Sequence, residues 1–127
     1  MNDILKTVKD IIADMNLKVV AEDNDHVAVR YQFNDIYFVY NKDNDNYLSV
    51  ILSEFDSADD DNRDEKIALC NELSYTMKVV KFNVIQRVII ASYEFFFLNE
   101  DDLKYHVTKS LNLLVAAKNN YNKHKNN

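Results

Sequence analysis

Residues 26–55, HVAVRYQFNDIYFVYNKDNDNYLSVILSEF, decide the fold of this chain. Apolar and polar residues alternate through most of this stretch, as they do in strands that bury one face of a sheet. Asn and Asp at positions 34 and 35 interrupt the alternation and are typical of a two-residue hairpin loop. A loop at these positions places Tyr31 opposite Phe38, so that apolar residues meet across the hairpin. The stretch therefore predicts an antiparallel β-meander.

The tripeptide Asp-Asn-Asp occurs twice between predicted strands, at residues 23–25 and 43–45. Phe38 shares a face with Val50 only if the loop between them has an odd number of residues. A three-residue loop at each tripeptide meets this requirement. Such loops need one residue in the left-handed region, usually Gly. The chain contains no Gly, so we expect an Asn or Asp to take this conformation.

The same tripeptides are candidates for a cation site. The first and third turns of a meander lie at the same end of the sheet, about 10 Å apart. Asp23, Asp25, Asp43 and Asp45 then share one rim, where their carboxylates bind a hard cation weakly. The EF-hand pattern is not met, because Asn46 stands where that loop requires Gly. A pair of turns and a cation site are therefore alternative interpretations.

The rest of the chain completes an α+β pattern. Helices are predicted at residues 2–16, at residues 64–77 and after Asn99, which is placed to cap the third helix. Further strands are expected at residues 17–22, 78–84 and 87–98. The order α-β-β-β-β-α-β-β-α predicts an antiparallel sheet of five to six strands with three helices. We expect one domain at residues 1–121 and a flexible polar tail at residues 122–127.

The composition excludes several classes of partner. The 127 residues carry a net charge of −6, so we expect neither a nucleic acid nor an anionic membrane surface as partner. The apolar runs are too short to cross a bilayer, and the N-terminus lacks the unbroken apolar stretch of a signal peptide. The single cysteine allows no internal disulfide. We therefore expect a cytoplasmic protein.

No catalytic or cofactor-binding constellation is recognisable in the sequence. Cys70 lies on the apolar stripe of the second predicted helix, so we expect a core cysteine rather than a nucleophile. His26, His106 and His124 share no metal-ligand spacing, and we expect them at the surface. Gly-rich phosphate-binding loops are excluded because the chain has no Gly. We therefore predict that the protein is not an enzyme and binds no cofactor.

One face of the predicted meander carries an aromatic and aliphatic patch beside Arg30. The members of the patch are Tyr37, Val39, Tyr47, Ile51 and Phe55. Three helices need not cover both faces of a sheet, and an uncovered patch of this kind is typical of a protein contact. Coverage of the patch by a helix is the alternative. We predict the patch and Arg30 as a protein-binding site.

Residues 67–97, IALCNELSYTMKVVKFNVIQRVIIASYEFFF, resemble the core of the YbjN family, whose fold is that of the type III secretion chaperones. The similar features are a helix with CNEL, a short polar turn, the strand KVVKF and a long strand that leads to a C-terminal helix. Asn71 matches the first Asn of the family's NxxN-like pattern, whereas Ser74 stands where the second Asn lies. The usual turn Gly between the last two strands is absent.

The resemblance implies a non-catalytic domain. Members of this fold resemble small acidic chaperones that dimerise and hold extended segments of client proteins, and other members are regulators. We therefore predict a chaperone-like or adaptor protein that forms a homodimer. It would bind a segment of a client protein through a sheet edge or through the aromatic face. The alternative is a small regulatory domain that binds a ligand or cation at the acidic rim of the turns.

Overall fold

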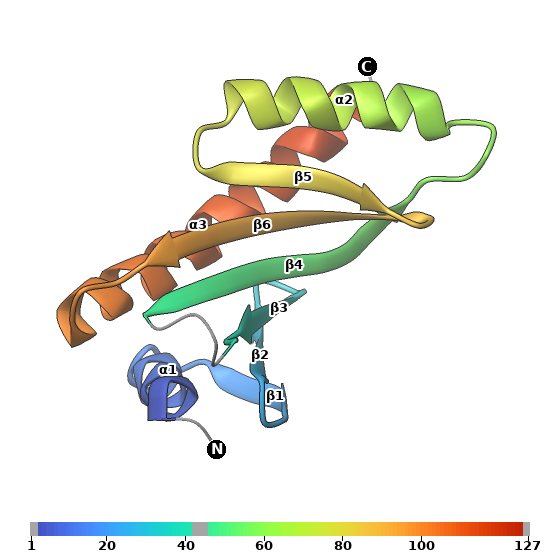
Figure 1. The fold of residues 1–127 in the computed structure, drawn as a ribbon. Helices are drawn as coiled ribbons and strands as arrows, with labels where there is room; N and C mark the ends of the chain where they lie inside the picture. Colours follow the sequence, from blue (N-terminus) through green and yellow to red (C-terminus); the bar gives the residue numbers. More distant parts are fainter. Residues whose placement is uncertain (1–2, 42–45, 126–127) are drawn as a thin grey trace.

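The computed structural model describes residues 3–41 and 46–125 (Figure 1). This part of the chain forms three helices and six strands in the predicted order. The helices are α1 (Asp3–Asp14), α2 (Arg63–Thr76) and α3 (Glu100–Lys125). The strands are β1 (Lys18–Glu22), β2 (His26–Tyr31), β3 (Asn34–Val39), β4 (Tyr47–Ser57), β5 (Val80–Ile85) and β6 (Val88–Phe96). The predicted α+β class is therefore confirmed.

The six strands form one antiparallel sheet in the order β1-β2-β3-β4-β6-β5. α1 and α3 contact each other and the sheet, whereas α2 lies along β5 (Figure 1). The apolar side chains of the helices and strands share one core, whose largest fully buried members include Tyr121, Phe38, Leu5, Ile12 and Ile36. Among the helices that the structure describes, none has the length and apolar character needed to cross a membrane.

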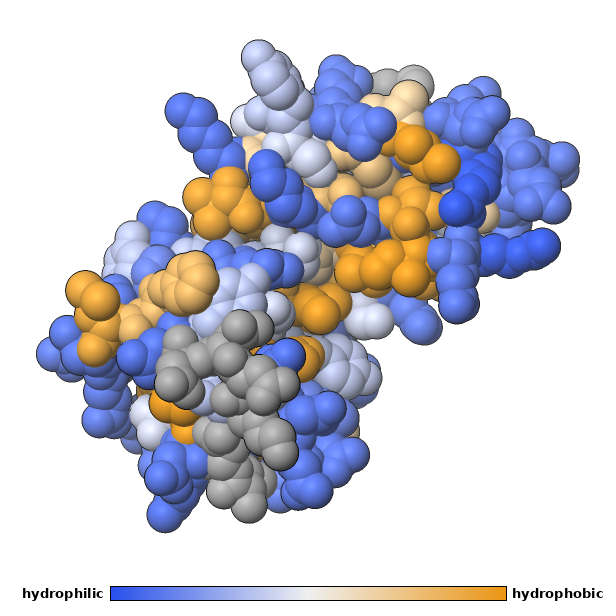
Figure 2. Space-filling view, viewed as in Figure 1, coloured by the Kyte–Doolittle hydropathy of each residue, from blue (hydrophilic) through white to orange (hydrophobic). Residues whose placement is uncertain are grey.

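The sheet has a second face, opposite α1 and α3, which we call the outer face. A row of side chains crosses it in register: Ala28 lies opposite Tyr37, Tyr37 opposite Ile51, Ile51 opposite Ser92, and Ser92 opposite Lys81. Because side chains alternate along a strand, the neighbours of these residues point to the core. Figure 2 shows the part of this face that β4, β6 and β5 form, where exposed hydrophobic residues lie between hydrophilic ones.

The register of β3 and β4 is as predicted, with Phe38 opposite Val50. The second Asp-Asn-Asp tripeptide, at residues 43–45, lies outside the described residues. Asn46, which follows it directly, has a φ of 58°. A left-handed Asn therefore adjoins this loop, one position beyond the predicted tripeptide.

The first Asp-Asn-Asp loop, at residues 23–25, differs from the prediction because none of its residues has a positive φ. The Asp23 N–H donates to the His26 carbonyl oxygen at 2.9 Å across the turn. The extra residue that the predicted three-residue loop would have held lies in β1 instead, where the register shifts between Val19 and Ala21. The expected left-handed Asn or Asp is therefore wrong at this turn, since a bulge in the strand replaces it.

The turn between β2 and β3 comes earlier than predicted. Gln32 and Phe33 form it, with φ values of 49° and 68°. Tyr31 lies opposite Asn34, so the predicted loop at residues 34–35 is wrong. The Asn34 side chain explains the difference, because it donates to the Gln32 carbonyl oxygen at 2.8 Å and accepts from Lys118 Nζ of α3 at 2.6 Å. The shift is by an even number of residues, so the same side chains face the core.

α3 begins as predicted but extends further than predicted. Asn99 Oδ1 accepts a hydrogen bond from the Asp102 N–H at 2.8 Å, which is the geometry of a helix cap. Residues 122–125, which we expected in a flexible tail, continue the helix to Lys125. Lys125 Nζ lies 3.5 Å from Asp56 Oδ2 of β4, so the end of the helix contacts the sheet.

Candidate protein-binding face and acidic turn

The outer face brings together three of the predicted binding residues. Tyr37, Val39 and Ile51 are half-buried and line a shallow cleft of about 290 Å³, which we call the outer cleft. Asp25 and His26 also line it, and the His26 ring lies 5.7 Å from the Tyr37 ring. A concave apolar surface with a charged rim is the arrangement found at protein contacts.

Tyr47 extends the hydrophobic surface of the outer face. Its ring lies 4.8 Å from the ring of Phe96, which is 73% exposed. The Tyr47 hydroxyl donates to Glu94, and burial together with this hydrogen bond raises the pKa of Tyr47. Phe96 was not among the predicted binding residues, although the alternation along β6 indicates that it shares a face with Glu94.

Phe55 does not belong to the outer face, and its predicted place there is wrong. Its ring lies 5.2 Å from Tyr121 and 6.2 Å from Phe82, both of which are buried in the core. The register of β4 shifts between Leu52 and Asp56, and Glu54 within the shift has a φ of 49°. This bulge turns Phe55 inward, because it breaks the alternation on which the prediction rested.

Arg30 lies beside the patch, as predicted, but its side chain has a partner. Arg30 Nε donates to Asp35 Oδ1 at 2.9 Å across the β2–β3 hairpin. Both side chains are well exposed, so the ion pair contributes little to stability. The guanidinium is therefore held at the margin of the outer face, where it is accessible to a partner.

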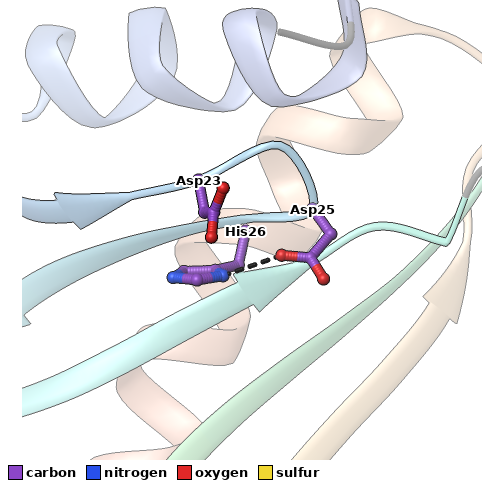
Figure 3. Close-up of side chains that lie close together, drawn as sticks. All are labelled: Asp23, Asp25 and His26. Atoms are coloured by element: carbon purple, nitrogen blue, oxygen red, sulfur yellow. Dashed lines mark hydrogen bonds and ion pairs between the residues drawn. The ribbon is translucent and has the colours of Figure 1, made fainter.

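The first Asp-Asn-Asp turn places three donor groups close together (Figure 3). The carboxylates of Asp23 and Asp25 and the His26 ring each offer one ligand atom, and these atoms lie within 4.8 Å of one another. His26 Nδ1 is 2.9 Å from Asp25 Oδ1. A mixed oxygen and nitrogen donor set suits a transition metal better than Ca²⁺. The predicted Asp43 and Asp45 lie outside the described residues.

His106 is half-buried rather than at the surface, which corrects its predicted place. Its Nδ1 is 2.7 Å from the Tyr93 hydroxyl, and its Nε2 is 3.6 Å from Asp102 Oδ1. Its ring stacks on Phe95 with the ring centroids 4.6 Å apart. Burial raises the pKa of Tyr93, which is 2% exposed, so its hydroxyl is kept neutral and away from solvent. This chain of side chains fastens α3 to β6.

A second polar cluster joins β4, α2 and α3. Asp56 Oδ2 accepts a hydrogen bond from the Tyr121 hydroxyl at 2.6 Å and lies 3.3 Å from Lys66 Nζ. Burial alone would raise the pKa of Asp56, but the hydrogen bonds from Tyr121, from the Ser57 N–H and from Lys66 outweigh it and lower that pKa. Cys70 nearby is 2% exposed, as predicted, and burial raises its pKa to about 11.

Both edges of the sheet are obstructed. At the β5 edge, the Phe82 N–H donates to Ser74 Oγ of α2 at 2.8 Å, so the helix satisfies this backbone group. At the β1 edge, the register shift bends the strand, and Glu22 forms an ion pair with Lys9 of α1 at 2.8 Å. Bulges, charges and covering helices are the usual means by which proteins prevent edge pairing.

The arrangement of one helix, a four-stranded meander, a helix, a hairpin and a long helix defines an α+β domain of the YbjN-like fold. YbjN from E. coli, described as a candidate transcription regulator, matches this chain with a TM-score of 0.69. The match covers 95% of this chain and 93% of that chain at 11% sequence identity. The comparison confirms the predicted fold.

A second solved structure, an uncharacterised protein from Methanothermobacter thermautotrophicus, matches with a TM-score of 0.55. That match covers 93% of this chain and 99% of the other chain at 13% identity. No family model and no curated protein matches the sequence. The likeness therefore extends over more than nine-tenths of each chain, at a sequence identity of 11–13%.

Proposed function

We propose that the protein is a non-catalytic, chaperone-like or adaptor protein of the cytoplasm that binds a segment of a client protein. The outer face carries this proposal. Its half-buried residues Tyr37, Val39 and Ile51 line the outer cleft, and Phe96 beside Tyr47 is 73% exposed. Apolar and aromatic side chains grouped on one face, with charges at the margin, support a protein contact.

The outer face is favoured over a sheet edge as the binding surface. A client segment that adds a strand needs free backbone groups on an edge. Ser74 already bonds the Phe82 N–H on β5, and the register shift after Val19 bends β1. The client is therefore expected to insert apolar side chains into the outer cleft rather than to extend the sheet.

The client interaction is tested by substituting charge into the cleft. Tagged wild-type protein, Val39→Glu and Ile51→Glu are used to capture partners from lysate of the native organism, with mass spectrometry of the captured proteins. We expect one near-stoichiometric partner for the wild type and its loss in both variants. Leu98→Glu is the matched control, because Leu98 is 88% exposed and does not line the cleft. Unfolding of both cleft variants would show that these residues are core and would contradict the proposal.

We also propose that the protein forms a homodimer, as the chaperones of this fold do. Light scattering of the purified full chain measures the mass directly. A mass of twice 14.9 kDa supports the dimer, and a mass of 14.9 kDa at working concentration contradicts it.

A second candidate function is a regulatory domain that binds a cation at the acidic turn. The grouping of Asp23, Asp25 and His26 within 4.8 Å favours it over a site made of carboxylates alone. The donor set of two carboxylates and an imidazole supports a divalent transition metal as the cation.

A further inference from the structure

A second cleft, of about 480 Å³, lies between α2 and the outer face of β5 and β6. Its polar lining consists of Asn71, Ser74, Lys81, Asn83, Ser92 and Glu94. The volume is within the range of small-molecule sites, roughly 300–1,000 Å³. We propose that this cleft, the α2–β5 cleft, binds a small zwitterionic molecule of the α-amino acid class.

Ser92 is the first observation that points to a ligand. Its residue surface is only 7% exposed, yet its hydroxyl has no hydrogen-bond partner in residues 3–41 and 46–125. The other buried polar residues, Asn34 and Ser110, are both hydrogen-bonded. Every buried side-chain oxygen of the described chain has either a hydrogen-bond partner or access to solvent. Because the Ser92 hydroxyl has no partner, it has access to solvent, and it reaches solvent through the cleft that Ser92 lines. The hydroxyl is therefore free to donate to, or accept from, a polar group bound in the cleft.

Two opposite charges flank Ser92. Lys81 lies directly opposite Ser92 on β5, and Glu94 is the next residue of the same face along β6. Diagonal neighbours of this kind are about 7–8 Å apart, and the two side chains do not form an ion pair with each other in the described structure. A small zwitterion bridges such a gap, with its carboxylate at the Lys81 ammonium and its own ammonium at the Glu94 carboxylate.

The side chain of the ligand would meet two amides. Asn71 of α2 and Asn83 of β5 are exposed, and neither side chain has a hydrogen-bond partner among the described residues. Both also line an adjoining cavity of about 170 Å³, together with Arg63 and several apolar residues. Each amide offers two donors and an acceptor. The two amides therefore favour an amino acid whose side chain can hydrogen-bond to them.

The α2–β5 cleft is distinct from the outer cleft, because Tyr37, Val39 and Ile51 do not line it, although Glu94 also accepts a hydrogen bond from Tyr47. It is tested by recording amide chemical shifts of the full chain while each common L-α-amino acid is added in turn. We expect at least one of them to shift the amides of Lys81, Ser92 and Glu94 saturably. The same compound with its amino group acetylated and its carboxyl group amidated should bind at least about tenfold more weakly.

Three variants complete the test. Lys81→Gln and Glu94→Gln should each weaken binding about tenfold or more, since each removes a charge-assisted hydrogen bond. Glu72→Gln is the matched control on α2: Glu72 is exposed and lies outside the cleft, so binding should be unchanged. The proposal is overturned if no amino acid shifts these amides, if the blocked compound binds equally well, or if both cleft variants bind like the wild type.

Discussion

The Tyr121 hydroxyl and the Asp56 carboxylate, 65 residues apart in sequence, form a hydrogen bond of 2.6 Å between α3 and the end of β4. Tyr121 is fully buried and Asp56 is mostly buried. Lys66 of α2 reaches the same carboxylate oxygen, so one acidic group joins three elements. The Asp56 carboxylate therefore links α2, which lines the α2–β5 cleft, to β4 and α3.

Removal of the Tyr121 hydroxyl should destabilise the domain. We expect Tyr121→Phe to lower the free energy of unfolding by about 2 kcal/mol, because a buried hydrogen bond to a charged group is lost while the ring is kept. Urea unfolding followed by circular dichroism measures the change. Tyr75→Phe is the matched control, since Tyr75 is 89% exposed, and it should leave stability unchanged. Equal stability of the two variants would show that the Asp56 contact does not hold α3.

The lowered pKa of Asp56 predicts a loss of stability in acid. The stabilisation is fully present above the ordinary Asp value of 3.8, and it is lost as the pH falls through the lower value of the folded protein. We expect the urea midpoint to fall more steeply below pH 3.8 in the wild type than in Asp56→Asn. An equally steep fall of the urea midpoint below pH 3.8 in the two proteins would contradict the prediction.

Cys70 should be inert in the folded protein. It is 2% exposed and its pKa is raised to about 11, so reagents that need a thiolate will react slowly. Because the unfolded thiol ionises at lower pH than the folded one, Cys70 also contributes to a loss of stability as the pH rises above 9. Labelling with an alkylating reagent, with and without urea, measures the difference. Equally fast labelling in both conditions would place Cys70 at the surface.

Ser74 should protect the β5 edge from pairing with other chains. In Ser74→Ala the Phe82 N–H loses its partner, and we expect a loss of about 1 kcal/mol in stability together with concentration-dependent association. Ser57→Ala is a suitable control, because Ser57 is exposed and forms hydrogen bonds to the described residues through its backbone atoms only. Analytical ultracentrifugation over a range of concentrations measures the mass of each variant in solution and so compares their association. An unchanged mass for Ser74→Ala would show that α2 covers the edge without this bond.

The acidic turn makes a prediction about cations. Zn²⁺ added to the metal-free protein should raise the melting temperature, and Asp25→Asn should remove the increase, because one of the three donors is lost. Ca²⁺ is the comparison, and it should have a smaller effect because it prefers oxygen ligands alone. A response to neither ion, or an equal response in the variant, would assign the tripeptide to turn formation only.

The alternation of apolar residues was sufficient to predict that consecutive strands of the meander pair and which faces most of them bury, but it did not predict the pairing of β4 with β6. It was not sufficient where a distant residue decides the local structure. At the turn of Gln32 and Phe33, Asn34 accepts a hydrogen bond from Lys118 of α3, a residue 84 positions away in the sequence. Phe55 turns inward because Glu54 takes a left-handed conformation that no local pattern indicates.

Some residues of the candidate sites could be predicted from the sequence and others could not. Tyr37, Val39 and Ile51 were predictable because strand alternation places them on one face. The place of His26 beside Asp25 follows from the turn, and the unpartnered Ser92 follows from burial, so neither is visible in residue spacing. Sites made by contact between α2 and the sheet require the three-dimensional structure.

Phe33 offers a direct test of backbone strain. It is fully exposed and has a φ of 68°, which is unfavourable for a residue with a Cβ atom. We expect Phe33→Gly to raise the free energy of unfolding by about 1 kcal/mol, since glycine adopts this conformation readily. Phe33→Ala is the matched control and should not stabilise the protein, because alanine keeps the Cβ atom. Stabilisation of both variants to the same extent would attribute the effect to loss of the exposed ring.

Seven residues of the described chain have left-handed backbone, and only Asn16 and Asn46 among them are of the types that tolerate it well. Gln86, at the turn between β5 and β6, is one of the other five. A left-handed position is usually recognised in a sequence by its glycine, and this chain has no glycine. The left-handed positions are therefore anchors for aligning distant relatives by backbone conformation where residue identity no longer serves.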